Sequence, residues 1–346
     1  MINTNIIINE NSSLKEALVK LDENPKMQTL MVTKNGKIVG TITDGDIRRG
    51  LINGLSNVDK VSDFMLKSFT FLQKGVYDKT KLDFIKEKQL KIVPELNEDG
   101  SLFRIIDFKK VKTILPIDAV IMAGGVGSRL MPLTKDTPKP MLEVGDKPIM
   151  EYNVDLLKSF GISHLTLSVK YLKEVIEDYY KDGSDKEMQI SYVTEDEPLG
   201  TIGAVKQIKQ FHNDYILVMN SDLLTNINLE AMFDELENDM AEMIIATTDY
   251  QVQIPYGVIE SKGNQVKALK EKPTYTYYSN AGIYIFKKSL VELIPDHSFF
   301  NATDFLDKLI ELNKKVLHYP IKRYWLDIGK HVDFEKAQRD VKSIRF

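Results

Sequence analysis

The sequence contains no cysteine among its 346 residues, and it lacks the marks of several other protein classes. Without cysteine the chain forms no disulfide and no thiolate metal site, which favours a reducing compartment such as the cytoplasm. No apolar run is long enough to span a bilayer, and the first residues lack the basic start and cleavage site of a signal peptide. The net charge of −4, with both signs interspersed, argues against nucleic acid or a membrane as partner. We therefore expect a cytoplasmic protein that binds neither.

Length and composition favour a globular protein with two domains. The chain is too long for one typical hydrophobic core, and 43% hydrophobic with 28% charged residues is ordinary for a globular protein. The stretch "FKKVKTILPIDAV" runs from the basic end of a predicted helix through Leu115 and Pro116 into an apolar strand, and proline cannot continue a helix. We expect one domain at residues 1–114 and a second at 116–346, coupled by a short linker.

Residues 1–114 contain an internal repeat. Ser13 and Glu16 predict a capping box at the start of a helix. Two strands joined by a tight hairpin and a further helix follow, and a helix at 79–88 begins the same order again. A helix-strand-strand-helix unit that occurs twice predicts a repeated α+β domain. The expected strands are residues 29–34, 37–43, 91–96 and 102–108.

This repeat resembles a tandem cystathionine-β-synthase-type (CBS) pair. Such pairs often bind adenine nucleotides, and the resemblance implies that Gly40, Thr43 and Asp46 surround the ribose. Helix capping alone also explains Thr43 and Asp46, so a ligand site and a simple cap both stay open. The second copy departs from the pattern at the three matching positions, which hold Arg104, Asp107 and Lys110.

From residue 117 onward, short apolar segments alternate with helical patterns. Such strands are typical of a buried, mostly parallel sheet. The pattern predicts a doubly wound, Rossmann-like α/β domain with a mixed sheet, whose ligands bind at the carboxyl ends of the strands. The expected strands are 118–123, 164–169, 189–194, 215–220 and 242–248, and the expected helices are 149–160, 171–181, 201–211 and 229–240.

The glycine-rich segment "AGGVGSR" at 123–129 follows the first of these strands. It is no Walker loop, and Leu130 stands where a dinucleotide fingerprint has its third glycine. The glycines leave backbone N–H groups accessible, while Arg129 and Lys139 add cations that suit phosphate oxygens. By itself, the segment is also compatible with an ordinary tight turn between strand and helix.

The longer string "AGGVGSRLMPLTKDTPKPMLEVGDKPIMEY" resembles the signature of sugar-1-phosphate nucleotidyltransferases. Further segments resembling that family follow in order: "EPLGTIGAV", "NSDLL", "YGVIE", "EKP", "NAGIYIF" and "WLDIGK". Arg129 and Lys139 are then implied to be catalytic. The implied nucleotide contacts are Ala123, Gly124, Gly125, Gly127, Ser128, Gly200 and Thr201. The implied sugar-phosphate contacts are Tyr256, Gly257, Glu271, Lys272 and Asn280.

The resemblance also implies a magnesium site and catalytic roles for Asp222 and Asp327. Mg²⁺ prefers one or two carboxylates together with substrate phosphates, and these two residues follow separate strands. Taken alone, an aspartate after a strand is more often a turn or cap residue. Ser221 is a departure, because the family often has glycine before the first aspartate.

The implied reaction joins a sugar 1-phosphate to a nucleoside triphosphate and releases pyrophosphate. "EPLGTIGAV" is closer to mannose-1-phosphate guanylyltransferases than to thymidylyl-transferring relatives, which favours GTP. The fusion with a CBS pair resembles the glucosamine-1-phosphate guanylyltransferases of bacterial legionaminic-acid pathways. Glucosamine 1-phosphate is therefore the first expected acceptor, with mannose or heptose 1-phosphate next.

Other functions stay open at this point. The nucleotide could be UTP, CTP or dTTP, and the acceptor could be phosphocholine or a similar alcohol phosphate. A non-catalytic, nucleotide-sensing regulator is a different class of hypothesis, although it would have little need for both metal carboxylates. The N-terminal pair is expected to have a regulatory or oligomerisation role, and the protein is expected to form a homo-oligomer.

Overall fold

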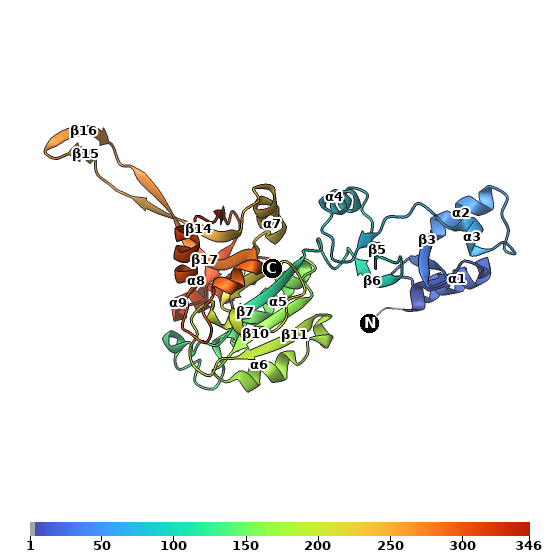
Figure 1. The fold of residues 1–346 in the computed structure, drawn as a ribbon, viewed down its shortest axis with the longest axis horizontal. Helices are drawn as coiled ribbons and strands as arrows, with labels where there is room; N and C mark the ends of the chain where they lie inside the picture. The colour runs from blue at the N-terminus through green and yellow to red at the C-terminus, as the bar shows by residue number, and fades with distance from the viewer. Residues whose placement is uncertain (1–3) are drawn as a thin grey trace. The chain divides into compact units, whose positions relative to one another are not determined.

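The computed structural model describes residues 4–346 and divides the chain into two compact units, one up to Pro116 and one from Ile117 (Figure 1). Between residues 4 and 346, no helix has both the length and the apolar character needed to cross a membrane.

The N-terminal unit contains two small three-stranded sheets of the same design. In the first, β2 (Thr29–Lys34) pairs in parallel with β1 (Ile7–Asn9) and antiparallel with β3 (Lys37–Thr43). In the second, β5 (Ile92–Leu96) pairs in the same two ways with β4 (Leu72–Gln73) and β6 (Leu102–Asp107). The expected α+β fold is confirmed. The helices are α1 (Leu14–Glu23), α2 (Asp44–Ile52), α3 (Val61–Phe64) and α4 (Lys79–Glu87).

The sequence predicts a capping box at the start of the first helix of this unit and a further helix after its last strand. The structure contains the capping box but not that last helix. The Ser13 side chain accepts from the backbone N–H of Glu16, and the Glu16 carboxylate accepts from the N–H of Ser13, so the predicted capping box is confirmed. The helix expected after the last strand is wrong. The N–H groups of Lys110 and Val111 both bond to the carbonyl of Asp107, which closes a single turn that does not propagate.

The C-terminal unit is built on a seven-stranded mixed sheet in the order β11-β10-β7-β12-β17-β14-β18. The first four strands are parallel, β17 is antiparallel to both of its neighbours, and β18 is parallel to β14. The expected Rossmann-like mixed sheet is confirmed. The strands are β7 (Ile117–Met122), β10 (His164–Val169), β11 (Gln189–Thr194), β12 (Tyr215–Asn220), β14 (Met243–Gln253), β17 (Thr274–Lys287) and β18 (Val316–Pro320).

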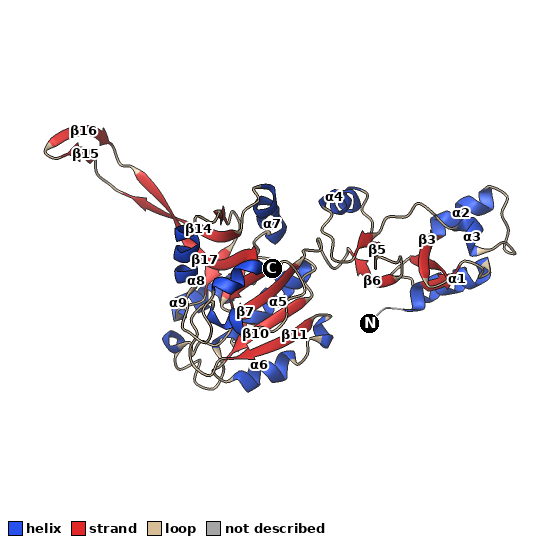
Figure 2. Ribbon diagram, in the orientation of Figure 1, coloured by secondary structure: helices blue, strands red, loops and turns tan. Residues whose placement is uncertain are grey.

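Helices lie outside this sheet in the C-terminal unit (Figure 2). Among the described residues, three two-stranded ribbons accompany it. They pair β8 (Glu143–Val144) with β9 (Lys147–Pro148), β13 (Leu223–Thr225) with β19 (Trp325–Asp327), and β15 (Val258–Lys262) with β16 (Gln265–Lys270). The helices are α5 (Ile149–Ser159), α6 (Lys173–Tyr180), α7 (Leu229–Asn238), α8 (Ala302–Glu311) and α9 (His331–Asp340).

The helix expected at 201–211 is wrong, since only a short 3₁₀ turn forms at Gly203–Gln207. Gly200 adopts φ +77°, and a side chain there would come within 2.6 Å of the carbonyl oxygen of Phe300. That carbonyl also accepts from the N–H groups of Ile202 and Gly203. The segment is therefore shaped by a tertiary contact, which helical periodicity does not report.

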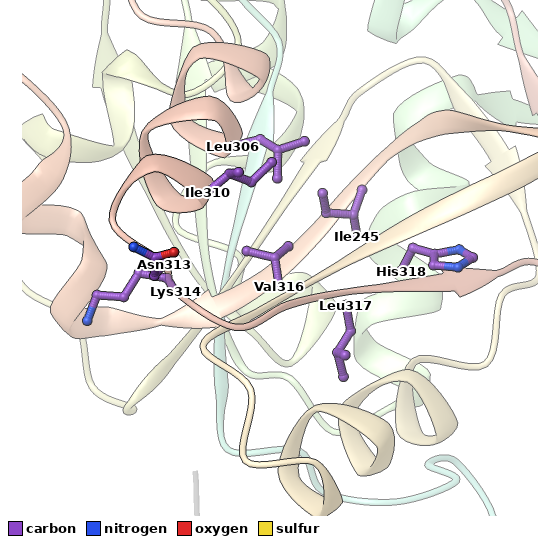
Figure 3. Close-up of a pocket in the computed structure, with 8 residues that line it drawn as sticks. All are labelled: Ile245, Leu306, Ile310, Asn313, Lys314, Val316, Leu317 and His318. Carbon is purple, nitrogen blue, oxygen red and sulfur yellow. The ribbon is translucent and has the colours of Figure 1, made fainter.

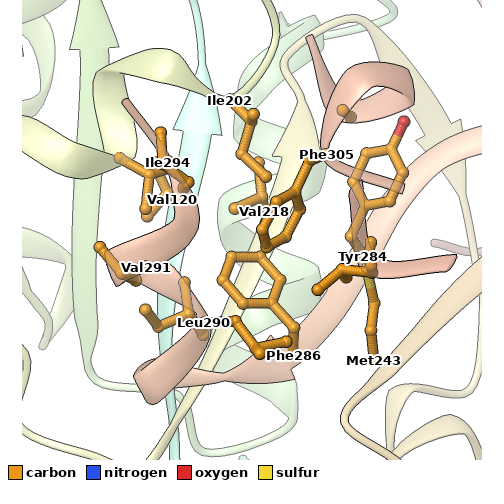
Figure 4. Close-up of a cluster of buried hydrophobic side chains, with 14 of the residues drawn as sticks. Val120, Ile202, Val218, Met243, Tyr284, Phe286, Leu290, Val291, Ile294 and Phe305 are labelled. Atoms are coloured by element: carbon orange, nitrogen blue, oxygen red, sulfur yellow. The ribbon is translucent and has the colours of Figure 1, made fainter. Parts of the chain in front are cut away.

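The main core of the C-terminal unit lies between the sheet and α8 (Figure 4). Phe286 on β17 and Phe305 on α8 are fully buried, and their ring centroids lie 5.3 Å apart in an edge-on arrangement. Burial of such rings is a large favourable contribution to folding. This contact fixes α8 on the sheet that carries the candidate site.

Replacing Phe305 with alanine is expected to lower the free energy of unfolding of the C-terminal unit by about 3–5 kcal/mol, because it leaves a cavity beside Phe286. Urea denaturation followed by the fluorescence of the single tryptophan, Trp325, measures this unit. Phe299→Ala is the matched control, because Phe299 is 62% exposed, and it should stay within about 0.5 kcal/mol of wild type. Equal effects of the two variants would contradict the assignment of this core.

Candidate active site

The glycine-rich loop follows β7 at the carboxyl edge of the parallel strands. The N–H of Ala123 donates to the carbonyl of Ser168, at the end of β10, over 2.8 Å. Gly127 adopts φ +66°, and a side chain there would come within 2.9 Å of Cβ of Lys139. The hydroxyl of Thr134 donates to the carbonyl of Gly127. Glycine at 127 therefore allows the Lys139 segment to pack directly on the loop.

The middle of this loop has backbone donors that the fold does not use. Within residues 4–346, no hydrogen bond engages the N–H groups of Gly124, Gly125, Val126 or Gly127. Gly125 also has open space where a side chain would be. Successive free N–H groups at the end of a strand are suited to anion binding. Ser128, whose side chain is exposed, begins the 3₁₀ turn Ser128–Leu130 after them.

Asp222 and Asp327 are brought together by the small ribbon of β13 and β19. Asp222 lies just beyond β12, and Leu223 pairs directly with Asp327 across the ribbon. The N–H of Ile328 donates to the carbonyl of Asp222 over 3.0 Å. Leu326 and Ile328 belong to a buried apolar cluster, so strand alternation turns the intervening Asp327 to the other face.

Two cations lie against these two carboxylates. Lys139 forms an ion pair with Asp222 in a largely buried position. A side chain at Gly329 would come within 3.5 Å of the Arg129 guanidinium and 3.6 Å of Asp327 Oδ1. Arg129 and Asp327 Oδ1 thus both lie beside Gly329, and Arg129 acts to lower the pKa of Asp327. The structure brings together the four residues that the sequence predicts to be catalytic.

The pKa of Asp327 departs from that of an ordinary aspartate. Burial and the neighbouring Asp222 raise the pKa of Asp327 from its usual 3.8 to about 6, although Lys139 and Arg129 act in the opposite direction. Among the described residues, Asp222 Oδ1 and Asp327 Oδ1 are buried without a hydrogen-bond partner. Two desolvated carboxylate oxygens that repel each other are a donor set suited to a divalent cation.

These residues fit a magnesium ion that also binds substrate phosphates. No cluster of three or more His, Asp or Glu side chains suited to a metal occurs from Thr4 to Phe346. Mg²⁺ does not need such a cage, because it is commonly held by one or two carboxylates, waters and phosphates. Asp222 and Asp327 would be its protein ligands.

Glu195 was not singled out from the sequence, yet it connects two parts of the site. It is buried, and its carboxylate accepts from the Ser168 hydroxyl over 2.5 Å and from the N–H of Leu199 over 3.0 Å. A side chain at Gly124 would come within 2.9 Å of Glu195 Oε1. Glu195 therefore ties the glycine loop to the "EPLGTIGAV" segment. A glutamate in a polar turn gives no sequence signal of such burial.

Asn153 on α5 and Trp325 on β19 were also missed. The buried Asn153 amide donates to the carbonyl of Ser221, next to Asp222. The indole N–H of Trp325 donates to the carbonyl of Ala281 over 3.0 Å. Both bonds hold the backbone beside the two aspartates. The family signature ends at Tyr152, one residue before Asn153, whereas Trp325 begins the segment "WLDIGK"; adjacency to these segments was the available signal.

The predicted nucleotide contact Thr201 has a structural partner. Its hydroxyl accepts from the N–H of Ala302, in the first turn of α8, over 2.8 Å. Gly200 packs on Phe300 beside it. The nucleotide roles of Gly200 and Thr201 stay predictions, while their contacts within the chain anchor the segment to α8.

The predicted sugar-phosphate contacts are not gathered around the aspartates. Beyond Thr247 and Asn280, strands β14 and β17 leave the sheet and pair only with each other, and a further ribbon of β15 (Val258–Lys262) and β16 (Gln265–Lys270) continues them (Figure 1). Tyr256, Gly257, Glu271 and Lys272 lie on this extension with exposed side chains, or an exposed backbone at Gly257. Asn280 lies at its base, where it bonds to Tyr284 and Gly282.

In the N-terminal unit, Thr43 and Asp46 act as a helix cap. The Asp46 carboxylate accepts from the N–H and the hydroxyl of Thr43, and the Thr43 hydroxyl accepts from the N–H of Asp46. Arg49 pairs with the same carboxylate. A side chain at Gly40 would come within 2.8 Å of the Met65 sulfur, so local packing also explains this glycine.

A hollow of about 500 Å³ lies elsewhere in the C-terminal unit (Figure 3). It is lined by apolar side chains of α8, β14 and β18 together with Asn313, Lys314 and His318. It contains no carboxylate and lies near the ends where β14 and β18 begin, opposite to the edge that carries Asp222. We assign the site by its charges and phosphate donors rather than by this hollow.

Comparison with protein families gives two matches. The model described as "Nucleotidyl transferase" matches residues 118–344. The model described as "CBS domain" matches residues 1–53. The first match includes the loop, both aspartates and the extension of β14 and β17.

Similar proteins come from several organisms. The mannose-1-phosphate guanylyltransferase of Mycobacterium tuberculosis is 31% identical over 65% of this chain, which spans 64% of that protein. The D-glycero-alpha-D-manno-heptose 1-phosphate guanylyltransferase of Aneurinibacillus thermoaerophilus is 32% identical over 65% of this chain and 98% of its own length. HddC from Yersinia pseudotuberculosis, whose structure contains GMP-PN, is 27% identical, with a TM-score of 0.51 over 65% of this chain and 99% of HddC.

Replacing Asp327 with asparagine is expected to stabilise the protein at pH 7.5 but not at pH 4. Because the pKa of Asp327 is raised to about 6, the folded chain holds this proton more tightly than the unfolded chain does. The contribution of the Asp327 carboxyl group to the stability of wild type therefore declines as the pH rises from about 4 to about 6. The variant lacks this titrating group and shows no such decline. The expected gain is about 1–2 kcal/mol, reduced by solvent screening.

Urea denaturation followed by circular dichroism at pH 4, 5, 6 and 7.5 measures this difference. Asp239→Asn is the control, because Asp239 lies on the surface in an ion pair with Lys315 and should show no comparable gain. A variant less stable than wild type at pH 7.5 would refute the repulsive environment of Asp327.

Proposed function

The chain belongs to the nucleotidyl transferase family, and we propose that it joins a sugar 1-phosphate to a nucleoside monophosphate taken from a nucleoside triphosphate, with release of pyrophosphate. The observation that carries this proposal is the grouping of Arg129, Lys139, Asp222 and Asp327 beside a loop with free N–H groups. Phosphoryl-type transfer depends mainly on positioning and charge neutralisation, and these groups supply both.

Each residue then has a defined task. A sugar-phosphate oxygen attacks the α-phosphorus in line; a new P–O bond forms, and the bond to the β-phosphate breaks as pyrophosphate leaves. The free N–H groups of the loop bind phosphate oxygens of the nucleotide. Arg129, with its planar fork of donors, and Lys139 stabilise charge that develops on the triphosphate. No covalent bond to the protein is required.

Magnesium, held by Asp222 and Asp327, would supply charge neutralisation at the reacting phosphates. In the chain itself, Lys139 neutralises Asp222. This ion pair holds the Lys139 ammonium beside the glycine loop, where it would bind a phosphate oxygen of the substrate.

For the nucleotide we propose GTP, and for the acceptor glucosamine 1-phosphate, with mannose or heptose 1-phosphate as the next choices. Relatives named as guanylyltransferases of mannose and heptose 1-phosphates support the guanine nucleotide and this group of acceptors. The CBS fusion supports the amino sugar and a place in legionaminic-acid formation. Family likeness supports this choice of base and sugar.

The N-terminal unit is proposed to regulate or assemble the enzyme. The CBS match supports an adenine nucleotide as its ligand, although the capping bonds of Thr43 and Asp46 already account for both side chains. If a nucleotide bound there changes the affinity for substrate, substrate changes the nucleotide affinity by the same factor.

Replacing Asp222 with alanine is expected to lower pyrophosphate release at least about 100-fold, because the variant loses one carboxylate of the metal pair and leaves Lys139 without its partner. A coupled pyrophosphate assay with Mg²⁺ measures this loss. Asp239→Ala, the same change at a surface position, should retain wild-type activity. Near-wild-type release by Asp222→Ala would rule out the proposed site.

Assaying GTP, UTP, CTP and dTTP against glucosamine, mannose and heptose 1-phosphates, with phosphocholine as a further acceptor, tests the specificity. We expect the highest kcat/KM for GTP with glucosamine 1-phosphate. A higher value for another pair would replace that assignment within the same reaction class. Nucleotide binding with no pyrophosphate from any pair would instead favour a nucleotide-sensing regulator.

Calorimetry on the full chain with AMP tests the N-terminal ligand. Binding that Asp46→Ala weakens at least about 10-fold, and that the surface variant Asp59→Ala leaves unchanged, is expected for a ribose contact. The absence of AMP binding to wild type would leave only an assembly role for this unit.

A further inference from the structure

The extension of the sheet, which we call the arm and define as residues 248–279, begins at the catalytic edge. β17 is antiparallel to β12, so its first half lies at the edge where β12 ends. At the base of the arm, a side chain at Gly282 would come within 2.5 Å of the Asn220 amide, and Trp325 donates to the carbonyl of Ala281. The base therefore lies beside the segments that carry Asp222 and Asp327.

The arm leads away from these aspartates. Ladder pairs run without a register shift from Thr247 and Asn280 to Gln253 and Thr274. Glu271 lies farther from the base than Thr274 does. At about 3.3 Å per residue, the ribbon from Asn280 to Glu271 is roughly 25–30 Å long. Between residues 249 and 277, the described hydrogen bonds and ion pairs of the arm all join arm residues to one another.

The ladder is interrupted at one place, which we call the joint. Pro255, Tyr256 and Gly257 lie on one strand there, opposite Glu271, Lys272 and Pro273 on the other. One backbone hydrogen bond, from Ile254 to Pro273, remains nearby. A bend at the joint moves the tip beyond it but leaves the joint itself at the same distance from the base. Tyr256, Glu271 and Lys272 therefore stay remote from the aspartates of their own chain.

The surface of the arm indicates a protein partner. A two-stranded ribbon has no core of its own and is marginally stable in isolation. The arm exposes several large apolar and aromatic side chains, and an exposed apolar patch marks an interaction site. The arm also carries both signs of charge, as in the exposed pair of Lys270 and Glu260, which does not suit nucleic acid or an anionic membrane. Its large exposed side chains include Tyr250, Tyr256, Ile259, Val266, Leu269 and Tyr277.

We propose that the arm of one copy of this chain lies over the catalytic edge of a second copy and completes its acceptor site. This inference rests on the proposed function, because Glu271 and Lys272 are useful only beside a bound nucleotide. A second copy is the partner that offers the matching half: free loop N–H groups, Arg129 and the two aspartates. There the Lys272 ammonium binds the sugar phosphate, and the Glu271 carboxylate accepts from sugar hydroxyls. In a twofold dimer each arm serves the other body.

Complementation between two inactive variants tests this arrangement. Asp222→Ala and Lys272→Ala are co-expressed with different affinity tags, and mixed assemblies are isolated over both tags. Each variant alone should lose at least about 10-fold in activity. The mixed dimer contains one site with an intact body and an intact arm, so it should recover about half of the wild-type activity. Lys267→Ala, an exposed change on the same arm, is the control and should be fully active alone.

The outcomes separate this proposal from the proposed function. Wild type without pyrophosphate release from any substrate pair would refute the function. An active wild type whose mixed assembly stays as inactive as its parents, a Lys272→Ala variant with full activity, or failure to obtain any mixed assembly would each overturn the shared site. Circular dichroism checks the fold of every variant, and Glu271→Gln replaces Lys272→Ala in the same experiment if the latter does not fold.

Discussion

Two aspartates held close together in a partly buried position are the constraint on which the rest of the site depends. Folding must keep Asp222 and Asp327 adjacent although they repel each other, and the raised pKa of Asp327 reports this cost. The β13–β19 pairing holds the two aspartates in place, because Leu326 and Ile328 pack into a buried apolar cluster. Lys139 and Arg129 then supply positive charge from a different part of the chain. Perturbed carboxylates of this kind are common at functional sites, and the pair would suit a divalent cation.

The glycines of this region have separate physical reasons. Gly127 allows the Lys139 segment to approach the loop, and Gly124 makes room for the buried Glu195. Gly125 faces open space, so packing does not require it. Close packing thus explains Gly124 and Gly127, whereas the N–H groups of residues 124–127 all stay free of hydrogen bonds within the described chain.

The sequence predicted those helices and strands whose own residue pattern determines their structure. It failed where a contact with a residue distant in the sequence determines the structure. The apolar run at 215–220 predicted β12 to the residue, because a buried central strand is uniformly apolar. The segment at 201–211 has helical periodicity, but the carbonyl of Phe300 takes its N–H groups and prevents the helix. Glu195 gave no sign of its burial, since nothing in the sequence shows Ser168 beside it. Family likeness found the four charged residues of the site, but it could not show that Glu271 and Lys272 lie on an arm, because strand pairing beyond a sheet depends on partners distant in the sequence.

If the arm binds the acceptor as proposed, the division between a rigid body and a projecting arm has a thermodynamic consequence. The loop, Arg129, Lys139 and the aspartates are fixed by the sheet and its cores, whereas the arm is fixed within its own chain only at its base. If an acceptor bridges the arm of one copy and the body of another, it binds the assembled form more tightly than the separate chains. Linkage then requires that the acceptor strengthens assembly by the same factor by which assembly raises acceptor affinity. Oligomerisation would in that case be a component of substrate recognition, and changes in the arm would alter acceptor choice without disturbing the charges that activate the nucleotide.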